Sequence, residues 1–170
     1  FDGEYREIHN HAVSDLLEPG SVFKPISIRT VLEDGYCDTT KTVDTGGGVW
    51  PMYGREMKDH NWRRGGYGTM NLPRTLEVSS NIGVSRIVDQ YYHDHPEKFI
   101  EGVYRSGITT DFQIPLAGYS PARIRMPKKN DRGQWLNWNN TALPWMSIGY
   151  ETQIPPISTL AFYNAIANGG

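Results

Sequence analysis

The spacing of apolar and polar positions along the chain predicts four helical stretches joined by long loops. In the first stretch, apolar residues recur at helical spacing after Ser21, and Gly35 supplies a stop. Prolines are expected at the starts of the last two helices, where a missing backbone N–H does no harm. The expected helices cover residues 21–34, 72–92, 96–106 and 156–167.

The second helical stretch is interrupted by Ser79-Ser80-Asn81. Serine and asparagine side chains compete for backbone hydrogen bonds, so the triplet is expected to separate two helices, with Asn81 or its neighbour as an N-cap. Capping is one interpretation. The other is that Ser79 and Asn81 project into a cleft, where Ser79 relays a proton and Asn81 holds a substrate amide.

The segments between the helices are rich in turn-forming residues. Residues 36–70 contain many Gly, Thr and aromatic residues, and the run from Thr42 to Thr45 predicts a short strand. Residues 1–17 are expected to be a lead-in segment, and residues 108–154 are expected to be loop-like. Trp135, Trp138 and Trp145 lie in that loop and are expected to form one apolar cluster that pins it, or else a wall for an extended ligand.

Composition limits the class of protein. The chain has 170 residues, 38% of them hydrophobic, and a formal net charge of -2, which is typical of about one globular domain. The sequence has no charged tail that would favour nucleic acid, and no apolar run long enough for a membrane span. Cys37 is the single cysteine and is interpreted as an incidental thiol. No cofactor and no metal is expected.

The strongest chemical signal is Glu18-Pro19-Gly20-Ser21-Val22-Phe23-Lys24-Pro25. On a helix, residues three apart lie on the same face, so the Ser21 hydroxyl and the Lys24 ammonium are expected to meet. Pro25 requires the first helical turn to begin close to Ser21. The helix dipole and partial burial would both lower the pKa of Lys24 towards a value at which it can take a proton from serine.

Two other motifs have ordinary interpretations beside functional ones. Asp44-Thr45-Gly46 is typical of aspartic proteases, but one copy would require a homodimer, and a plain turn is the alternative. His93-Asp94-His95 offers metal ligands, but adjacent residues on an exposed turn point apart, so a solvated turn is expected.

Three segments in the right order resemble penicillin-binding proteins, specifically the monofunctional (class B) transpeptidases. They are the run 10–25 with its Ser-x-x-Lys motif, the Ser-x-Asn motif at 79–81, and the stretch from Ser147 to Tyr150 followed by the segment 167–170. The resemblance covers nearly the whole chain. Glu151 departs from it, because the family commonly has glycine there.

The resemblance implies that Ser21 is the acylated nucleophile, Lys24 the general base, and Ser79 and Asn81 the second side of the cleft. The implied activity is D,D-transpeptidation of peptidoglycan stem peptides ending in D-alanyl-D-alanine, with β-lactams acylating the same serine. The parent protein would be anchored in the cytoplasmic membrane of a bacterium with this domain on the outer side, among other cell-wall synthesis proteins. A non-catalytic β-lactam sensor and a serine β-lactamase are the alternatives.

The family's third motif, Lys-Thr-Gly, does not occur in the chain. Residues 1–170 are therefore expected to be a partial transpeptidase domain, truncated at both ends, in which the antiparallel sheet has lost its strands. The expected fold is mainly α, the helical half of an α/β domain, with a small β element near residues 40–60. Such a piece is expected to be nearly inert alone and to self-associate through an exposed apolar face.

Overall fold

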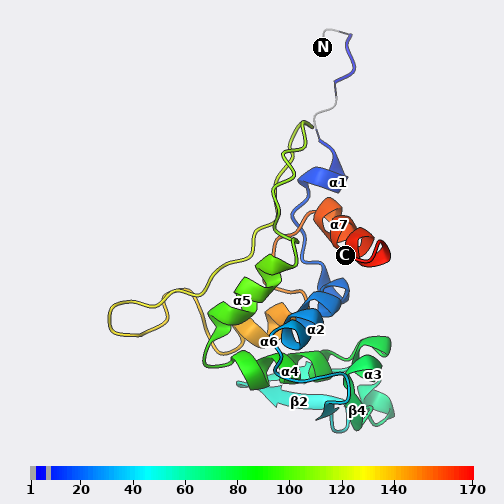
Figure 1. The fold of residues 1–170 in the computed structure, drawn as a ribbon, viewed down its shortest axis with the longest axis vertical. Coiled ribbons are helices and arrows are strands. Elements are labelled where there is room, and N and C mark those ends of the chain that lie inside the picture. The colour runs from blue at the N-terminus through cyan, green and yellow to red at the C-terminus, as the bar shows by residue number, and fades with distance from the viewer. Residues whose placement is uncertain (1–2, 7–8) are drawn as a thin grey trace.

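The computed structural model describes residues 3–6 and 9–170 and has a helical body with two small two-stranded sheets at one end (Figure 1). In chain order the elements are α1 (His11–Ser14), η1 (Gly20–Phe23), α2 (Lys24–Glu33), β1 (Thr42–Asp44), β2 (Val49–Met52), β3 (Arg55–Lys58), η2 (Trp62–Arg64), β4 (Thr69–Asn71), α3 (Leu72–Glu77), α4 (Asn81–Tyr92), α5 (Pro96–Arg105), α6 (Ala142–Ser147) and α7 (Pro156–Ala167). Five of the helices, α2, α3, α4, α5 and α7, lie close to the four expected stretches, the second of which is divided into two helices as expected.

The first predicted helix is confirmed, with one refinement. It begins as the 3-10 turn η1, and α2 continues from Lys24 with Pro25 in its first turn, where proline costs no hydrogen bond. Gly35 follows the helix with φ of 72°, a left-handed conformation that glycine adopts without strain. The serine of the Ser-x-x-Lys motif therefore lies in the turn that leads into α2.

Helix α4 is the centre of the body and packs against α2, α5 and α6. Its apolar side chains Ile82, Val84, Ile87 and Val88 have no exposed surface. Burying an aliphatic side chain of this kind stabilises a fold by about 1.5–3 kcal/mol relative to leaving it exposed. The position of the start of α4 is therefore held by extensive packing.

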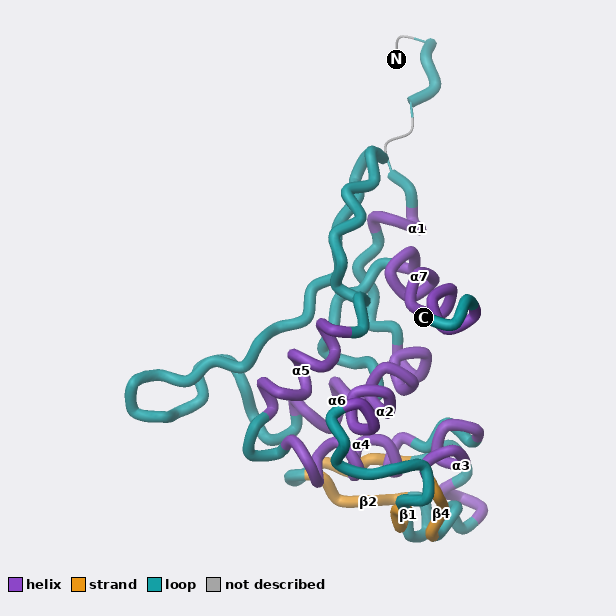
Figure 2. The backbone as a smooth tube through the Cα atoms, in the orientation of Figure 1, coloured by secondary structure: helices purple, strands orange, loops and turns teal. Residues whose placement is uncertain are grey.

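The prediction of a small β element near residues 40–60 is confirmed, and its strands, which pair antiparallel, extend further than expected (Figure 2). Strands β2 and β3 form one hairpin, with Trp50 opposite Met57. Strand β1 pairs with β4, which lies beyond residue 60. The end of β3 lies at the N-terminal end of α4, whereas the turn between β2 and β3 lies near its C-terminal end, where the Tyr53 hydroxyl donates to Asp89 Oδ2 at 2.7 Å. The residues that follow β3 can therefore contact the start of α4.

The prediction that residues 108–154 are all loop was wrong, because α6 lies within them. Its buried residues Leu143 and Met146 pack into the core, and Ser27 Oγ donates to Ser147 O at 2.7 Å, which ties α2 to α6. Sequence reasoning missed this helix because it is only six residues long and contains a proline.

The three tryptophans of this region do not form one cluster. Within the described residues, none of their rings stacks on another, and each lies under a different cation: Lys129 over Trp135, Arg125 over Trp138 and Arg55 over Trp145. Trp138 and Trp145 pack separately against the core. Trp135 and Trp138 line one small cavity together, so the alternative of a wall fits two of the three rings.

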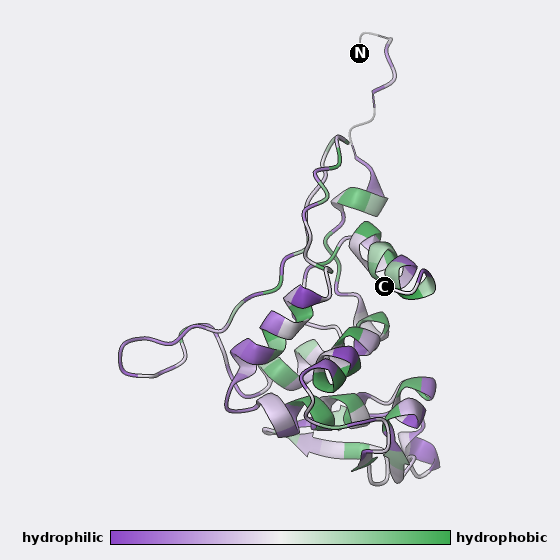
Figure 3. Ribbon diagram, viewed as in Figure 1, coloured by the Kyte–Doolittle hydropathy of each residue, from purple (hydrophilic) through white to green (hydrophobic). Residues whose placement is uncertain are grey.

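Helix α7 carries an apolar face that the described residues leave exposed (Figure 3). Leu160 is 63% exposed and Ile166 is 55% exposed, whereas Phe162 is buried. The helix packs beside α1, at the end of the molecule away from the two sheets. Self-association through this face stays a prediction. Among the helices within residues 3–6 and 9–170, none has the length and apolar character needed to cross a bilayer.

Gly149 positions the turn that contains Ser21. Gly20 N donates to Gly149 O at 3.1 Å, and a Cβ placed on Gly149 would lie 2.0 Å from Gly20 O. Gly149 also has a φ of 90°, which favours glycine. The two backbones can approach this closely only because residue 149 has no side chain.

We expect Gly149→Ala to lower the free energy of unfolding by about 2–5 kcal/mol, from left-handed strain plus overpacking. Gly133→Ala is the matched control. Gly133 also has a positive φ of 76°, but a Cβ there meets nothing within 4 Å, so its cost should be strain alone, about 1–2 kcal/mol. Urea unfolding of the two variants measures the difference, and equal losses would contradict the role of this close contact.

Candidate active site

Lys24 joins the two motifs that the sequence singled out. Its side chain is 1% exposed, and its Nζ donates to Ser79 O at 2.6 Å and to Ser79 Oγ at 2.9 Å. A buried lysine is stable only when its donors are satisfied. Two of the three N–H donors of the ammonium bind Ser79, so the third is left to bind another group.

Burial lowers the pKa of Lys24 to about 8 from its ordinary value of 10.5, because desolvation disfavours the charged ammonium. The negative charge of Asp59 acts in the opposite direction and raises the pKa of Lys24. At pH 7 about a tenth of the lysine is then the neutral amine, which is the form that can accept a proton.

Ser79 lies at the end of α3 in a conformation that normally requires glycine. Ser80 N donates to Thr75 O and Ser79 N donates to Leu76 O, which is the Schellman motif that ends many helices. Its central position is left-handed, and Ser79 occupies it with φ of 52°. A non-glycine residue in this conformation costs of order 1 kcal/mol of folding free energy. The turn brings both oxygens of Ser79 into hydrogen-bond contact with the Lys24 ammonium.

Ser80 begins α4 as its N-cap and is completely buried. Its Oγ accepts from Gly83 N at 2.8 Å and donates to Asp59 Oδ2 at 2.7 Å. Asp59 Oδ1 in turn accepts from Ile82 N at 3.0 Å. The prediction of a cap within the triplet is confirmed, with Ser80 as the capping residue.

Asp59 is the residue of this site that sequence reasoning missed. It is 1% exposed, follows β3, and places a carboxylate at the N-terminal end of α4, where the free N–H groups and the dipole favour negative charge. No motif marks it, because its importance arises from packing between a hairpin and a helix that lie far apart in the sequence. Asp59 therefore acts on Lys24 electrostatically and positions the start of α4.

Asn81 is the first residue of α4, and its side chain is oriented by the same hairpin. Its Nδ2 donates to Lys58 O at 2.8 Å, so its amide oxygen remains as an acceptor. Lys58 and Asp59 together hold the start of α4 at the end of β3. Asn81 and Ser79 are thus placed by neighbouring contacts, one on each side of the buried Ser80.

Ser21 is exposed, in the turn that precedes Lys24. The Ser21–Lys24 hydrogen bond expected from the spacing is not formed, because within the described residues the Ser21 hydroxyl has no partner and the Lys24 ammonium binds Ser79 instead. Such bonds often tighten only when substrate is bound. The structure therefore places Lys24 and Ser79 in contact, with Ser21 on the adjoining turn.

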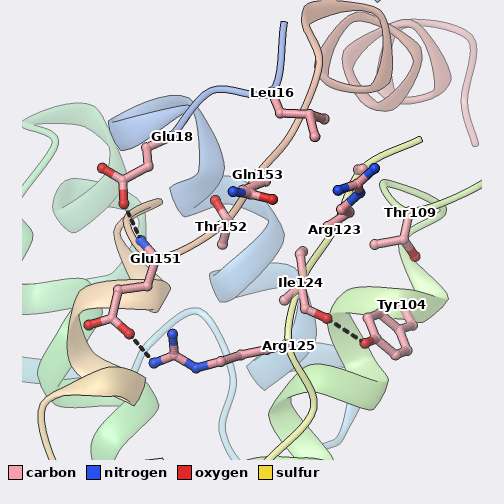
Figure 4. A pocket seen from close by; sticks show the side chains of 11 residues that line it. Leu16, Glu18, Tyr104, Thr109, Arg123, Ile124, Arg125, Glu151, Thr152 and Gln153 are labelled. Carbon is pink, nitrogen blue, oxygen red and sulfur yellow. Dashed lines mark hydrogen bonds and ion pairs between the residues drawn. The ribbon is translucent and has the colours of Figure 1, made fainter. Parts of the chain in front are cut away.

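The segment after Gly149 is hydrogen-bonded to Glu18, three residues before Ser21 (Figure 4). Glu18 Oε1 accepts from Glu151 N at 2.7 Å, and the Glu151 carboxylate pairs with Arg125. Glu151 has φ of 57°, which explains physically why glycine would suit this position. Beyond it lies a cavity of about 810 Å3 between the segments 122–125 and 151–153. That cavity does not include the four candidate residues.

The other motifs have ordinary structural roles. Asp44 Oδ1 accepts from Gly46 N at 2.8 Å in a tight turn, as the plain interpretation of Asp44-Thr45-Gly46 expects. His93 contacts Asp89 and His95 contacts Glu97, so the two histidines have separate partners. The Cys37 thiol is half-buried, and burial raises its pKa, which disfavours the reactive thiolate.

The family model described as "Penicillin binding protein transpeptidase domain" matches residues 2–170. Among curated proteins, the chain is 27% identical over 163 residues to a probable peptidoglycan D,D-transpeptidase PbpC of Pseudomonas aeruginosa, covering 96% of this chain and 26% of that protein. It is 25% identical over 164 residues to the peptidoglycan D,D-transpeptidase FtsI of Escherichia coli K12, covering 96% of this chain and 25% of that protein. The chain thus spans about a quarter of the length of these two relatives.

Solved structures agree with the family model. A peptidoglycan glycosyltransferase from Burkholderia ambifaria superposes with a TM-score of 0.79 at 25% identity, covering 95% of this chain and 46% of that one. The apo transpeptidase domain of penicillin-binding protein 3 from Burkholderia pseudomallei also superposes with a TM-score of 0.79. Its identity is 26%, and the match covers 95% of this chain and 44% of that one. The fold is therefore part of an α/β transpeptidase domain, and the chain belongs to the family of penicillin-binding protein transpeptidase domains.

Proposed function

We propose that this protein is a serine D,D-transpeptidase that cross-links peptidoglycan stem peptides ending in D-alanyl-D-alanine, and that β-lactams acylate it at the same serine. The observation that carries the proposal is the buried Lys24 ammonium bound to both oxygens of Ser79, beside the Ser21 turn. Family membership and relatives named as peptidoglycan D,D-transpeptidases support the same chemistry.

In the acylation step, Ser21 Oγ attacks the carbonyl carbon of the penultimate D-alanine while neutral Lys24 takes the hydroxyl proton. The peptide C–N bond then breaks, and the terminal D-alanine leaves as its amine after receiving a proton. Ser79 is suited to relay that proton, because its hydroxyl already accepts from the Lys24 ammonium. The amine of a second stem peptide then attacks the Ser21 ester and completes the cross-link.

Asn81 has a positioning role in this proposal. Because Lys58 O occupies its Nδ2, the free amide oxygen can accept an N–H from the substrate backbone. We place the protein at the outer side of the cytoplasmic membrane, among other cell-wall synthesis proteins, because its substrate is assembled there. The relatives are named as peptidoglycan D,D-transpeptidases, and we propose a role in cell division or cell shape without choosing between them.

In the full-length parent protein, fluorescent penicillin should bind covalently and the adduct should map to Ser21, whereas residues 1–170 alone are expected to label far more slowly. Lys24→Ala should slow labelling by about two to four orders of magnitude, which is the usual contribution of a general base. The control is Lys98→Ala, since Lys98 lies on the exposed surface of α5 and should label at the parental rate. An adduct on Ser79, or unchanged labelling of Lys24→Ala, would contradict the assignment.

Because neutral Lys24 is the base, the labelling rate should rise with pH around a midpoint of about 8, the lysine pKa. Two units below that midpoint the rate should be about a hundredfold below its plateau. Asp59→Asn should move the midpoint to lower pH, since the Asp59 carboxylate raises the pKa of Lys24.

Asp131→Asn, a change of an exposed acid, is the control and should leave the midpoint in place. A role of Asp59 in folding alone would lower the amount of active protein without moving the midpoint. An unchanged midpoint in Asp59→Asn would therefore contradict the electrostatic role that we give to this residue.

Asn81→Ala should reduce turnover of a D-alanyl-D-alanine peptide by about fivefold to a hundredfold, because an unpaired amide partner costs about 1–3 kcal/mol. Asn71→Ala is the matched control. Asn71 likewise begins a helix, where its Oδ1 accepts from Arg74 N, but it lies at the start of α3. Turnover measured at equal amounts of folded protein should be normal for the control, and normal turnover in Asn81→Ala would reduce that residue to a structural role.

A further inference from the structure

A group of potential metal ligands lies outside the cleft, around α1. His9, His11 and Asp15 bring two imidazole nitrogens and a carboxylate within 4.8 Å of one another. Among the described residues, this is the group of three His, Cys, Asp or Glu side chains that could hold a metal ion. The proposed transpeptidase chemistry uses none of the three. Their position, six to twelve residues before Ser21, is therefore open to a separate interpretation.

The carboxylate is the centre of the group. His9 Nε2 lies 2.7 Å from Asp15 Oδ1, and His11 Nδ1 lies 2.9 Å from Asp15 Oδ2. Two different imidazoles thus direct ring nitrogens at two oxygens of one carboxylate.

Backbone geometry explains the convergence. Asn10 caps α1 with its side chain, His11 is the first helical residue, and Asp15 is the C-cap, so His11 and Asp15 face one another across a single turn. His9 precedes the cap and returns to the same carboxylate. The imidazole rings meet edge to face, with centroids 4.7 Å apart.

We infer that His9, His11 and Asp15 form a binding site for a divalent transition metal ion of the zinc type. Zinc accepts imidazole nitrogen and carboxylate oxygen at about 2.0–2.2 Å, so ligand atoms in a tetrahedral site lie about 3.3–3.5 Å apart. The two nitrogen–oxygen distances of 2.7 and 2.9 Å would have to lengthen by about half an ångström to admit the ion, and all of the ligand atoms already lie within 4.8 Å of one another. Two nitrogens and one oxygen also suit zinc better than calcium or magnesium, which prefer oxygen ligands.

Accessibility and surroundings agree with this inference. The side chains of His9 and His11 are 46% and 82% exposed, so an ion can enter and water can fill the fourth position. Ser14 Oγ is buried and, among the described residues, has no hydrogen-bond partner. A Cβ on Gly118 would lie 2.9 Å from Ser14 Oγ and 4.0 Å from His9 Nδ1, so the backbone of Gly118 lies close to both side chains.

Zinc at this site would link His9, which precedes α1, to His11 at its start and to Asp15 at its end. A single helical turn is marginal alone, and α1 is held otherwise by the buried Val13 and by the hydrogen bond from Ser120 N to Val13 O. From Asp15 the chain continues to Leu17, which pairs with Ile154, and then to the Ser21 turn. The ion would therefore stabilise the segment that leads into the cleft.

The test uses purified protein without a polyhistidine tag, dialysed against a chelator and then titrated with zinc chloride in a calorimeter. We expect one equivalent to bind and, at a hundredfold excess over Kd, to raise Tm by about 5–10 °C. His11→Gln and Asp15→Asn should each weaken binding at least about tenfold, because even indirect partners of a metal site contribute that much. His11 is so exposed that its substitution should leave folding unchanged.

The matched control is His93→Gln. His93 Nδ1 lies 3.2 Å from Asp89 and so makes the same kind of pair, but within the described part of the chain no third His, Cys, Asp or Glu joins it. We expect His93→Gln to bind zinc like the parent. The inference is overturned if the parent binds no zinc, if His11→Gln binds it equally well, or if His93→Gln weakens binding as much as His11→Gln does.

Discussion

The contact between the Lys24 ammonium and the two oxygens of Ser79 is the interaction on which the site depends. A lysine with 1% exposure is costly, and this one is kept in place because a backbone carbonyl and a hydroxyl satisfy its donors. The same burial that makes the contact necessary lowers the pKa of the lysine to about 8. The Lys24–Ser79 contact and the lowered pKa of Lys24 therefore have the same cause, which is the removal of the ammonium from water.

That contact requires a turn at Ser79 that is strained and rigidly held. The Schellman motif ending α3 leads directly into the N-cap of α4, so Ser80 serves both helices. The buried carboxylate of Asp59 fixes the cap from the end of β3, and Lys58 O orients Asn81 beside it. A small hairpin thus determines where the side chains of the Ser-x-Asn motif lie.

The other wall of the site depends on close backbone packing. Gly149 lies against Gly20 with no room for a side chain, and Glu18 receives the N–H of Glu151. Glu151 holds its left-handed conformation with this hydrogen bond and with its pairing to Arg125. Segments separated by about 130 residues in the chain are therefore joined at the turn that carries Ser21.

The sequence by itself determined the helices with clear periodicity, the cap within the triplet at 79–81, the small β element and the residue types of the site. These features arise from local rules, such as the limits that Pro25 places on the first turn of α2. Only the tertiary structure decided that Lys24 binds Ser79 rather than Ser21 and that the Asp59 carboxylate lies at the N-terminal end of α4. It also decided that α6 forms within an expected loop and that the three tryptophans do not form one cluster. Each of these depends on contacts between distant segments, and the free energy of burying them is not encoded in any local pattern.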